Sequence, residues 1–200
     1  VVWVRPVIVA QAVDVHIGLY PEEDGSVGFE IYSGQDVVHS QGSAVPLVTD
    51  VIEPLDLTVL REQCAAAELA GSDCYEGFAA LGLAYGPAQR AIETIHIGQG
   101  QALARLHLPA SVVSTQSQYV LHPSMLDASL QAVVGLTGDV QEGQLALPFA
   151  VQEVDILGRC KGQMWAWVRQ VPDGSDQGRV RKFDITLCDD DGVICVQLKG

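Results

Sequence analysis

Alternating hydrophobic and polar residues fill most of the first 45 positions, which is the pattern of half-buried β-strands. In the clearest stretch the apolar members of the alternation are Val13, Val15, Ile17 and Leu19. A turn-forming run at 21–25 separates it from two further strands, expected at 27–32 and 37–45. We therefore expect residues 1–45 to form a meander of strands and residues 46–56, which contain two prolines, to form a linker.

After the linker the hydrophobic period changes to that of helices. Asp56 can cap a helix running from Leu57 to about Ala67, because its carboxylate accepts hydrogen bonds from the free N–H groups of the first turn. A second, short helix is expected at 75–81, and strands are expected near 91–97 and 102–108.

The most regular helical pattern begins at Pro123, a residue favoured in the first turn because its missing N–H costs nothing there. Its apolar residues recur at helical spacing as Leu126, Leu130, Val133 and Val134. Strand-like segments follow at 147–156, 163–170, 180–187 and 193–198, with a hairpin turn at 189–192. We expect the helix, from Pro123 to about Leu136, to lie buried lengthwise against a curved antiparallel sheet.

The charge of the chain limits its partners. Its 200 residues carry a formal net charge of −14, which repels nucleic acid and anionic membranes, so neither partner is expected. No apolar run is long enough to span a bilayer, and the segment that opens at Val1 lacks the basic flank and cleavage site of a signal peptide. Five cysteines without a C-x-x-C pair indicate reduced thiols in a cytoplasmic protein. No Cys/His spacing fits zinc, so no metal site is expected.

Asp127 is the first candidate for chemistry. It belongs to a His-Pro-Ser-Met-Leu-Asp segment that starts at His122, and Gln131 follows it by four residues, so both side chains share one face of the helix. A carboxylate beside apolar surface can have a raised pKa and act as a general acid. The alternative is an exposed carboxylate early in a helix, where the helix dipole favours negative charge.

A second candidate is the turn formed by Tyr85, Gly86 and Pro87. A tyrosine in such a turn can direct its hydroxyl into a pocket, or it can simply pack at the turn. The turn precedes the helix start at His122 by 35 residues. The two motifs at this spacing are more informative than either motif alone.

The Tyr-Gly-Pro turn followed by a His-Pro-x-x-Leu-Asp-x-x-x-Gln helix start resembles the dehydratase domains of modular polyketide synthases. The chain looks most like domains of synthases whose acyltransferase acts in trans. The resemblance continues through the Leu-Pro-Phe-Ala segment at 147–150 and covers essentially the whole chain. It implies an α+β double hotdog, in which two antiparallel sheets each wrap round a long helix. Residues 1–45 would be the later strands of an incomplete first hotdog, and residues 57–200 the second hotdog.

The resemblance also implies roles for individual residues. Asp127 corresponds to the family's catalytic aspartate, which protonates or orients the departing β-hydroxyl of a 3-hydroxyacyl thioester as it becomes a 2-enoyl thioester. Gln131 would orient Asp127 or bind the same hydroxyl. The other expected substrate-binding residues are Tyr85, Gly86, Pro87, His122 and Leu126, of which His122 would be structural and not the base.

The expected partners follow from the same resemblance. The substrate would be carried on the phosphopantetheine arm of an acyl carrier protein, so the chain itself would need no cofactor. Neighbouring synthase domains would be further partners, and the synthase would be a homodimer. One basic cluster could dock the acidic carrier or a neighbouring domain, or it could only balance nearby aspartates; its members are Arg169, Arg179, Arg181 and Lys182.

One part of the family pattern is absent. The family's base is a histidine in an H-x-x-x-G-x-x-x-x-P motif, and none of the five histidines of this chain has that context. We expect the upstream segment to be either removed or naturally missing, and the chain alone to show no dehydratase activity. Two alternatives stay open: a non-catalytic scaffold or docking domain, and a sister activity such as a double-bond isomerase or a pyran synthase. Retention of Asp127 argues against the isomerase.

Overall fold

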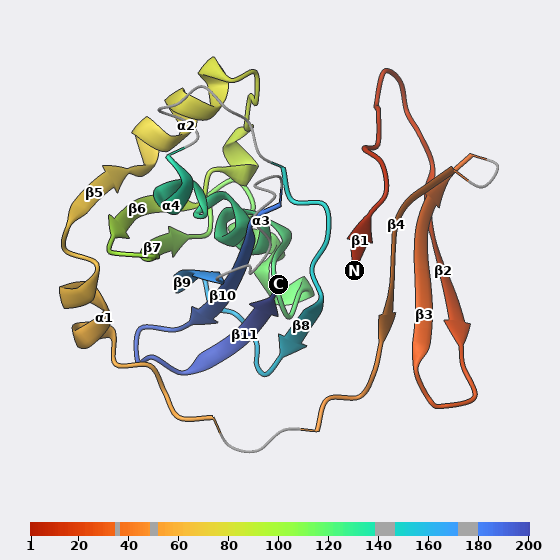
Figure 1. Cartoon of the computed structure of the whole chain (residues 1–200). Helices are drawn as coiled ribbons and strands as arrows, with labels where there is room; N and C mark the ends of the chain where they lie inside the picture. The colour runs from red at the N-terminus through yellow and green to blue at the C-terminus, as the bar shows by residue number, and fades with distance from the viewer. Residues whose placement is uncertain (35–36, 49–51, 139–146, 172–179) are drawn as a thin grey trace. The chain divides into compact units, whose positions relative to one another are not determined.

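The computed structural model describes residues 1–34, 37–48, 52–138, 147–171 and 180–200 (Figure 1). The chain divides into two compact units, and each is described by itself. The first unit contains Val1–Asp50 together with Leu147–Glu153, and the second contains the remaining residues.

The first unit is a four-stranded antiparallel sheet. Its strands are β1 (Val2–Trp3), β2 (Val15–Pro21), β3 (Val27–Ser33) and β4 (Val37–Ala44), in the order β1-β4-β3-β2. The strands expected in this region are confirmed. The segment after residue 146 was expected to start a long strand at 147–156 within the second region. Only its last residues, Glu153–Ile156, form such a strand, whereas Leu147–Glu153 packs in the first unit, where Trp3 donates its backbone N–H to the carbonyl of Phe149 at 2.9 Å.

The second unit is a seven-stranded antiparallel sheet in the order β5-β6-β7-β9-β10-β11-β8. Its strands are β5 (Ala67–Ala70), β6 (Ile92–Ile97), β7 (Gln101–His107), β8 (Glu153–Ile156), β9 (Gln163–Val171), β10 (Lys182–Cys188) and β11 (Ile194–Lys199). Its helices are α1 (Leu57–Gln63), α2 (Gly71–Ala80), α3 (Pro123–Gln131) and α4 (Val134–Thr137), with 3₁₀ turns η1 (Pro87–Gln89) and η2 (Val113–Gln118).

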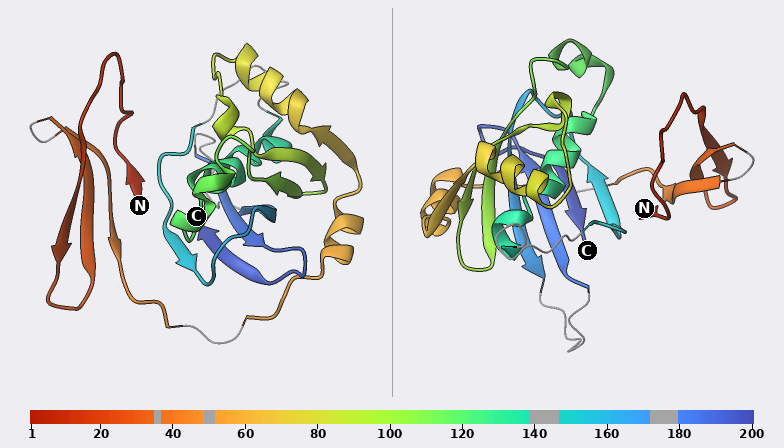
Figure 2. Two further views of the ribbon diagram at one scale, coloured as in Figure 1. Left: turned by 180° about the vertical axis from the view of Figure 1, so that it is seen from behind. Right: turned by 90° about the horizontal axis from the view of Figure 1, so that it is seen from above.

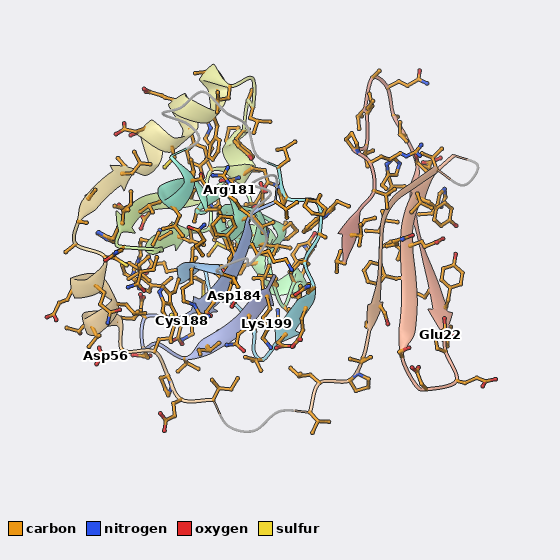
Figure 3. The ribbon with its side chains drawn as sticks, viewed as in Figure 1. Glu22, Asp56, Arg181, Asp184, Cys188 and Lys199 are labelled. Carbon is orange, nitrogen blue, oxygen red and sulfur yellow. The ribbon has the colours of Figure 1, made fainter. Side chains whose placement is uncertain are left out.

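Helix α1 begins where its expected cap, Asp56, predicted, but it ends earlier than expected. Asp56 Oδ1 accepts hydrogen bonds from the backbone N–H groups of Thr58 and Val59 at 3.0 and 3.1 Å (Figure 3). We expected this helix to reach Ala67, but it ends at Gln63 and Ala67 begins β5. The chain leaves the helix there because the N–H of Ala66 already bonds to the carbonyl of Ile97 at 3.0 Å, which starts the pairing of β5 with β6.

The central helix packs against the concave side of this sheet, as expected, and Val134 of the expected stripe is buried at 7% exposure. The stripe that faces the strands consists of Met125, Ala128, Ser129 and Ala132, all fully buried. Leu126, Leu130 and Val133 of the expected stripe are only half-buried. The chain also lies close to the sheet at Gly135, where a side chain would meet Ile95 at 2.7 Å.

The helix is also interrupted. Residues 132 and 133 form a turn between α3 and α4, and Val133 and Gly135 donate their N–H groups to carbonyls three residues back. Figure 2 shows the ribbon of the second unit from behind and from above. On the other face of the sheet, α1 covers a separate buried cluster of Leu60, Cys64, Leu103, Trp165 and Cys188. Helices therefore pack on both faces of the sheet. The side of α3 that does not face the strands carries Asp127, which belongs to the candidate site.

Candidate functional site

Asp127 and Gln131 lie on one face of α3, one turn apart, and they are hydrogen-bonded. The Nε2 group of Gln131 donates to Asp127 Oδ2 at 2.8 Å. The four-residue spacing made this contact predictable, and the structure confirms that the two side chains meet. Asp127 is half-buried and Gln131 is 6% exposed.

The amide of Gln131 is held from three directions. Its Nε2 also donates to the backbone carbonyl of Gln89 in η1 at 3.2 Å, and its Oε1 accepts from the hydroxyl of Tyr75 on α2 at 3.1 Å. The Tyr75 oxygen in turn accepts from the backbone N–H of Ile92 at 3.0 Å. Tyr75 was not among the residues that the sequence singled out. The only available signal was that a tyrosine in an apolar helix usually finds a partner for its hydroxyl when buried.

The surroundings of Asp127 favour its protonated form. Burial raises the pKa of its carboxyl, and the hydrogen bond from Gln131 offsets part of that rise. Burial likewise raises the pKa of Tyr75, to about 12, so this hydroxyl keeps its proton at neutral pH. A carboxyl that holds a proton more readily than in water and lies at the edge of a protein surface has the property needed of a general acid.

Tyr85 packs beside this network through its ring, and its expected contact with substrate remains a prediction. Its ring meets those of Tyr75 and Phe78 edge to face, with centroids 6.0 and 5.2 Å apart. The pKa of its half-buried hydroxyl is raised by burial and by the nearby charge of Asp127. Arg90 donates from Nε to the Tyr85 carbonyl at 2.9 Å and places its guanidinium over the Tyr75 ring.

Gly86 and Pro87 shape the turn that carries Tyr85. Gly86 precedes η1 and its carbonyl accepts the N–H of Gln89 at 2.9 Å, which fixes the carbonyl of Gln89 that bonds to Gln131. Pro87 occupies the first position of η1. Both residues are exposed, so their expected contact with substrate remains a prediction.

His122 has a structural role at the start of α3. Its Nδ1 accepts the backbone N–H of Ser124 at 3.1 Å, and its Nε2 lies 3.0 Å from the hydroxyl of Thr115, which itself donates to the Val112 carbonyl. The network assigns the proton to Nε2 and uses both ring nitrogens. Burial lowers the pKa of His122, which keeps the ring neutral. Its expected substrate contact, like that of the half-buried Leu126, stays a prediction.

The other two histidines of the second unit have acidic neighbours. His96 lies 3.4 Å from Glu68, and His107 lies 3.3 Å from Glu93. In the first unit, His39 bonds to Ser33 at 2.7 Å and His16 stacks on Tyr32. Within the second unit, therefore, no described contact joins a histidine to Asp127.

The proposed basic cluster is only partly described. Arg169 on β9 stands opposite Asp184 on β10, 4.0 Å away, and its guanidinium lies 4.2 Å from the centre of the Trp167 ring. Lys182 begins β10 and Arg181 precedes it (Figure 3), whereas Arg179 lies outside the described residues. The pairing of Arg169 with Asp184 favours charge balance for that residue, and carrier docking remains untested.

Two further observations concern the described part of the chain. None of its helices has the length and hydrophobicity to cross a bilayer. Its described residues also contain no group of three or more His, Cys, Asp or Glu side chains arranged to hold a metal ion.

Comparison with known proteins places this geometry in a family. Residues 52–200 match the family described as polyketide synthase dehydratase N-terminal domain. The chain is 41% identical to polyketide synthase PksN and 36% identical to PksM, both of Bacillus subtilis, over its whole length, which corresponds to 4% and 5% of those proteins. It also superposes on the crystal structure of a trans-AT polyketide synthase dehydratase domain from Brevibacillus brevis with a TM-score of 0.90 and 44% identity, covering 72% of that chain.

The chain belongs to the polyketide synthase dehydratase family. The expected α+β double-hotdog fold class is confirmed by this match and by the dehydratase domain of the CurK module of the curacin synthase, with a TM-score of 0.87.

Proposed function

We propose that this chain supplies the acid half of a dehydratase active site that acts on a 3-hydroxyacyl thioester. The observation that carries the proposal is the half-buried carboxyl of Asp127, whose pKa is raised by burial and whose orientation is fixed by Gln131. Variants of the CurK dehydratase with histidine replaced by phenylalanine, or aspartate by asparagine, are inactive, which supports a chemistry based on these two residue types.

The reaction divides the proton transfers between two groups. A base removes the proton from the α-carbon, which is acidic because the thioester carbonyl stabilises the enolate. The electron pair forms the α,β double bond as the β-carbon–oxygen bond breaks, and Asp127 gives its proton to the departing hydroxyl, which leaves as water. Neither proton transfer requires a metal or redox cofactor. A positioned acid of this kind contributes on the order of a hundred- to ten-thousand-fold in rate.

The base is proposed to come from another segment of the synthase. Within the second unit the three histidines have other partners: His96 and His107 lie beside glutamates, and His122 caps α3. The chain covers 72% of the Brevibacillus domain that it matches, which leaves room in such a domain for a further segment. A non-catalytic scaffold is the second candidate, and the same observation about the histidines favours it.

The carrier of the substrate is part of the proposal. Membership of a polyketide synthase family supports an acyl carrier protein and neighbouring synthase domains as partners. The phosphopantetheine arm of the carrier would bring the thioester to Asp127 between Tyr85 and Gln131. A homodimeric synthase remains an expectation of the resemblance.

Substrate analogues provide the test. A 3-hydroxybutyryl pantetheine thioester is added to the chain labelled with ¹³C at aspartate carboxyls and ¹⁵N at glutamine side chains, and its 3-deoxy analogue serves as control. We expect the hydroxy compound alone to shift the signals of Asp127 and Gln131. Equal shifts from both compounds, or none, would favour the scaffold.

Turnover gives the complementary measurement. With 3-hydroxyacyl carrier protein as substrate, we expect no dehydrated product by mass spectrometry from the chain alone, because the base is missing. Product formation that disappears when one of the five histidines is substituted would show that the base lies within this chain and would overturn that part of the proposal.

A further inference from the structure

The hydroxyl of Tyr75 occupies a junction between three elements of the second unit. Tyr75 belongs to α2 and is 7% exposed, and its oxygen accepts the N–H of Ile92 at the start of β6. The same hydroxyl donates to Oε1 of Gln131 on α3 at 3.1 Å. One hydroxyl group, on α2, therefore links the helix that carries Asp127 to the start of β6.

This contact determines which way the Gln131 amide faces. With its oxygen directed at Tyr75, the amide presents its two N–H donors to the carboxylate of Asp127 at 2.8 Å and to the carbonyl of Gln89 at 3.2 Å. If the amide were flipped, its oxygen would face two other acceptors, and the hydroxyl of Tyr75 would face an NH₂ group. Each buried group that lost its partner would cost about 1–3 kcal/mol.

The ring of Tyr75 is itself held on several sides. Phe78 and Tyr85 pack against it with ring centroids 6.3 and 6.0 Å away, and the Arg90 guanidinium lies 5.6 Å from its centre. The hydroxyl also remains a donor at neutral pH, because its proton is retained. Tyr75 is thus a donor whose ring is packed on several sides and whose hydroxyl keeps its proton at neutral pH.

We propose that Tyr75 is a positioning residue that locks the side-chain amide of Gln131 in the orientation that donates to Asp127. It has no described contact with Asp127 itself and acts through Gln131. Its importance for catalysis rests on the proposed dehydratase function, whereas the locking of the amide does not.

The test measures the proton affinity of Asp127 in the whole chain by ¹³C NMR titration of its carboxyl. The charged and titratable groups around the network are Cys74, Tyr75, Tyr85 and Arg90, and burial raises the pKa of the first three, so their protons stay bound in the acidic range in which Asp127 titrates. Because the bond from Gln131 lowers the pKa of Asp127, Tyr75→Phe is expected to raise it, and Gln131→Leu to raise it at least as far. The double variant should match Gln131→Leu alone, since both changes act on one contact.

The matched control is Tyr119→Phe, which removes a hydroxyl from a tyrosine that packs on His122 and should leave the titration of Asp127 unchanged. If Tyr75→Phe leaves the pKa of Asp127 at its wild-type value while Gln131→Leu raises it, Tyr75 only fills space and the proposal is wrong. The same holds if the two single effects add in the double variant.

A second measurement keeps the proposal testable if Tyr75→Phe fails to fold. In the wild-type chain the side-chain NH₂ protons of Gln131 should exchange with water at least roughly tenfold more slowly than those of exposed glutamines, as buried hydrogen bonds require. If the side-chain NH₂ protons of Gln131 exchanged as fast as those of the exposed Gln152, the Gln131 amide would not be held in place and the proposal would be contradicted. Failure of the dehydratase proposal would appear separately, as equal shifts from the hydroxy and deoxy thioesters with the titration result intact.

Discussion

The two units have antiparallel sheets of similar strand length but very different cores. In the second unit the concave side of the sheet is sealed by α3 and α4, and residues such as Ile95, Ala104 and Val168 are 0% exposed. In the described part of the first unit, Val151 is the only buried hydrophobic side chain, and Ile17 and Leu19 of β2 remain 67% and 65% exposed. The pattern of alternation is equally clear in both, so alternation alone shows which residues share a face and not whether that face is covered.

Buried polar side chains occur in both units, and in the first unit His39 is 7% exposed and lies 2.7 Å from the hydroxyl of Ser33. In the second unit, buried polar side chains form the network around Asp127 and a second one around Asp189. Asp189 accepts the N–H groups of Asp191 and Val193 at 3.0 Å and an ion pair from Lys161. Burial raises the pKa of Asp189, but these partners outweigh it and the pKa is lowered, opposite to that of Asp127. The pKa values of two carboxyls in one unit are thus shifted in opposite directions, because burial dominates at Asp127 and the hydrogen-bond partners dominate at Asp189.

The largest effect is expected from the core that only the second unit has. Met125→Ala removes a side chain that is 0% exposed between α3 and the sheet, and should cost about 2–5 kcal/mol because it leaves a cavity. Urea unfolding followed by fluorescence of Trp165 and Trp167, in a Trp3→Phe background, reports on the second unit. A loss below 1 kcal/mol would show that the helix is not a tightly packed part of this core.

A smaller loss is expected at the β10–β11 turn. Asp189→Ala should cost about 1–3 kcal/mol at pH 7, because two backbone N–H groups and Lys161 lose their acceptor. The pKa of Asp189 is lowered in the folded state, so its stabilisation is present above the unfolded value near 3.8 and is lost as the pH falls through the folded value.

The difference between wild type and Asp189→Ala should therefore shrink below about pH 4. The exposed neighbour Asp191 provides the control, and Asp191→Ala should change stability by less than about 0.5 kcal/mol. A difference independent of pH would show that the carboxylate charge is not involved.

Asp127→Asn should act in the opposite direction. The folded state raises the pKa of Asp127, so the charged carboxylate costs stability once the pH rises through the folded value. Removing that charge should increase stability at pH 7 by roughly 0.5–1 kcal/mol, as is common when a functional group is neutralised. Thermal unfolding at pH 7 and at pH 3.5 checks this, since the gain should be smaller at the lower pH. A loss of stability at pH 7 would contradict the raised pKa.

The smallest effect is expected on the exposed sheet of the first unit. Ile17→Ser should change the free energy of unfolding by less than about 0.5 kcal/mol, because its side chain is 67% exposed. Circular dichroism during urea unfolding measures it. A cost comparable to that of Met125→Ala would mean that this face is covered by other parts of the chain in solution.

The strands and the start of α3 could be predicted from period, turns and caps, because these features depend on residues close in sequence. The end of α1 could not, since the pairing of Ala66 with Ile97 decides it. Most of the buried stripe was also missed, since Met125, Ala128 and Ala132 are 0% exposed whereas Val134 is the one buried member of the expected stripe. Within the site, Asp127 and Gln131 are one helical turn apart and were found together, whereas Tyr75 is 56 residues from Gln131 and no local pattern indicates the contact.

The most direct test of the account is the pKa of Asp127 in the unmodified chain, measured by ¹³C NMR titration of its carboxyl signal. We expect a pKa above 3.8, the ordinary value for an aspartate, and a further rise when Gln131 is replaced by leucine. A pKa at or below 3.8 would mean that the carboxyl is well solvated and fully charged, and Asp127 could then not serve as the acid of a dehydratase.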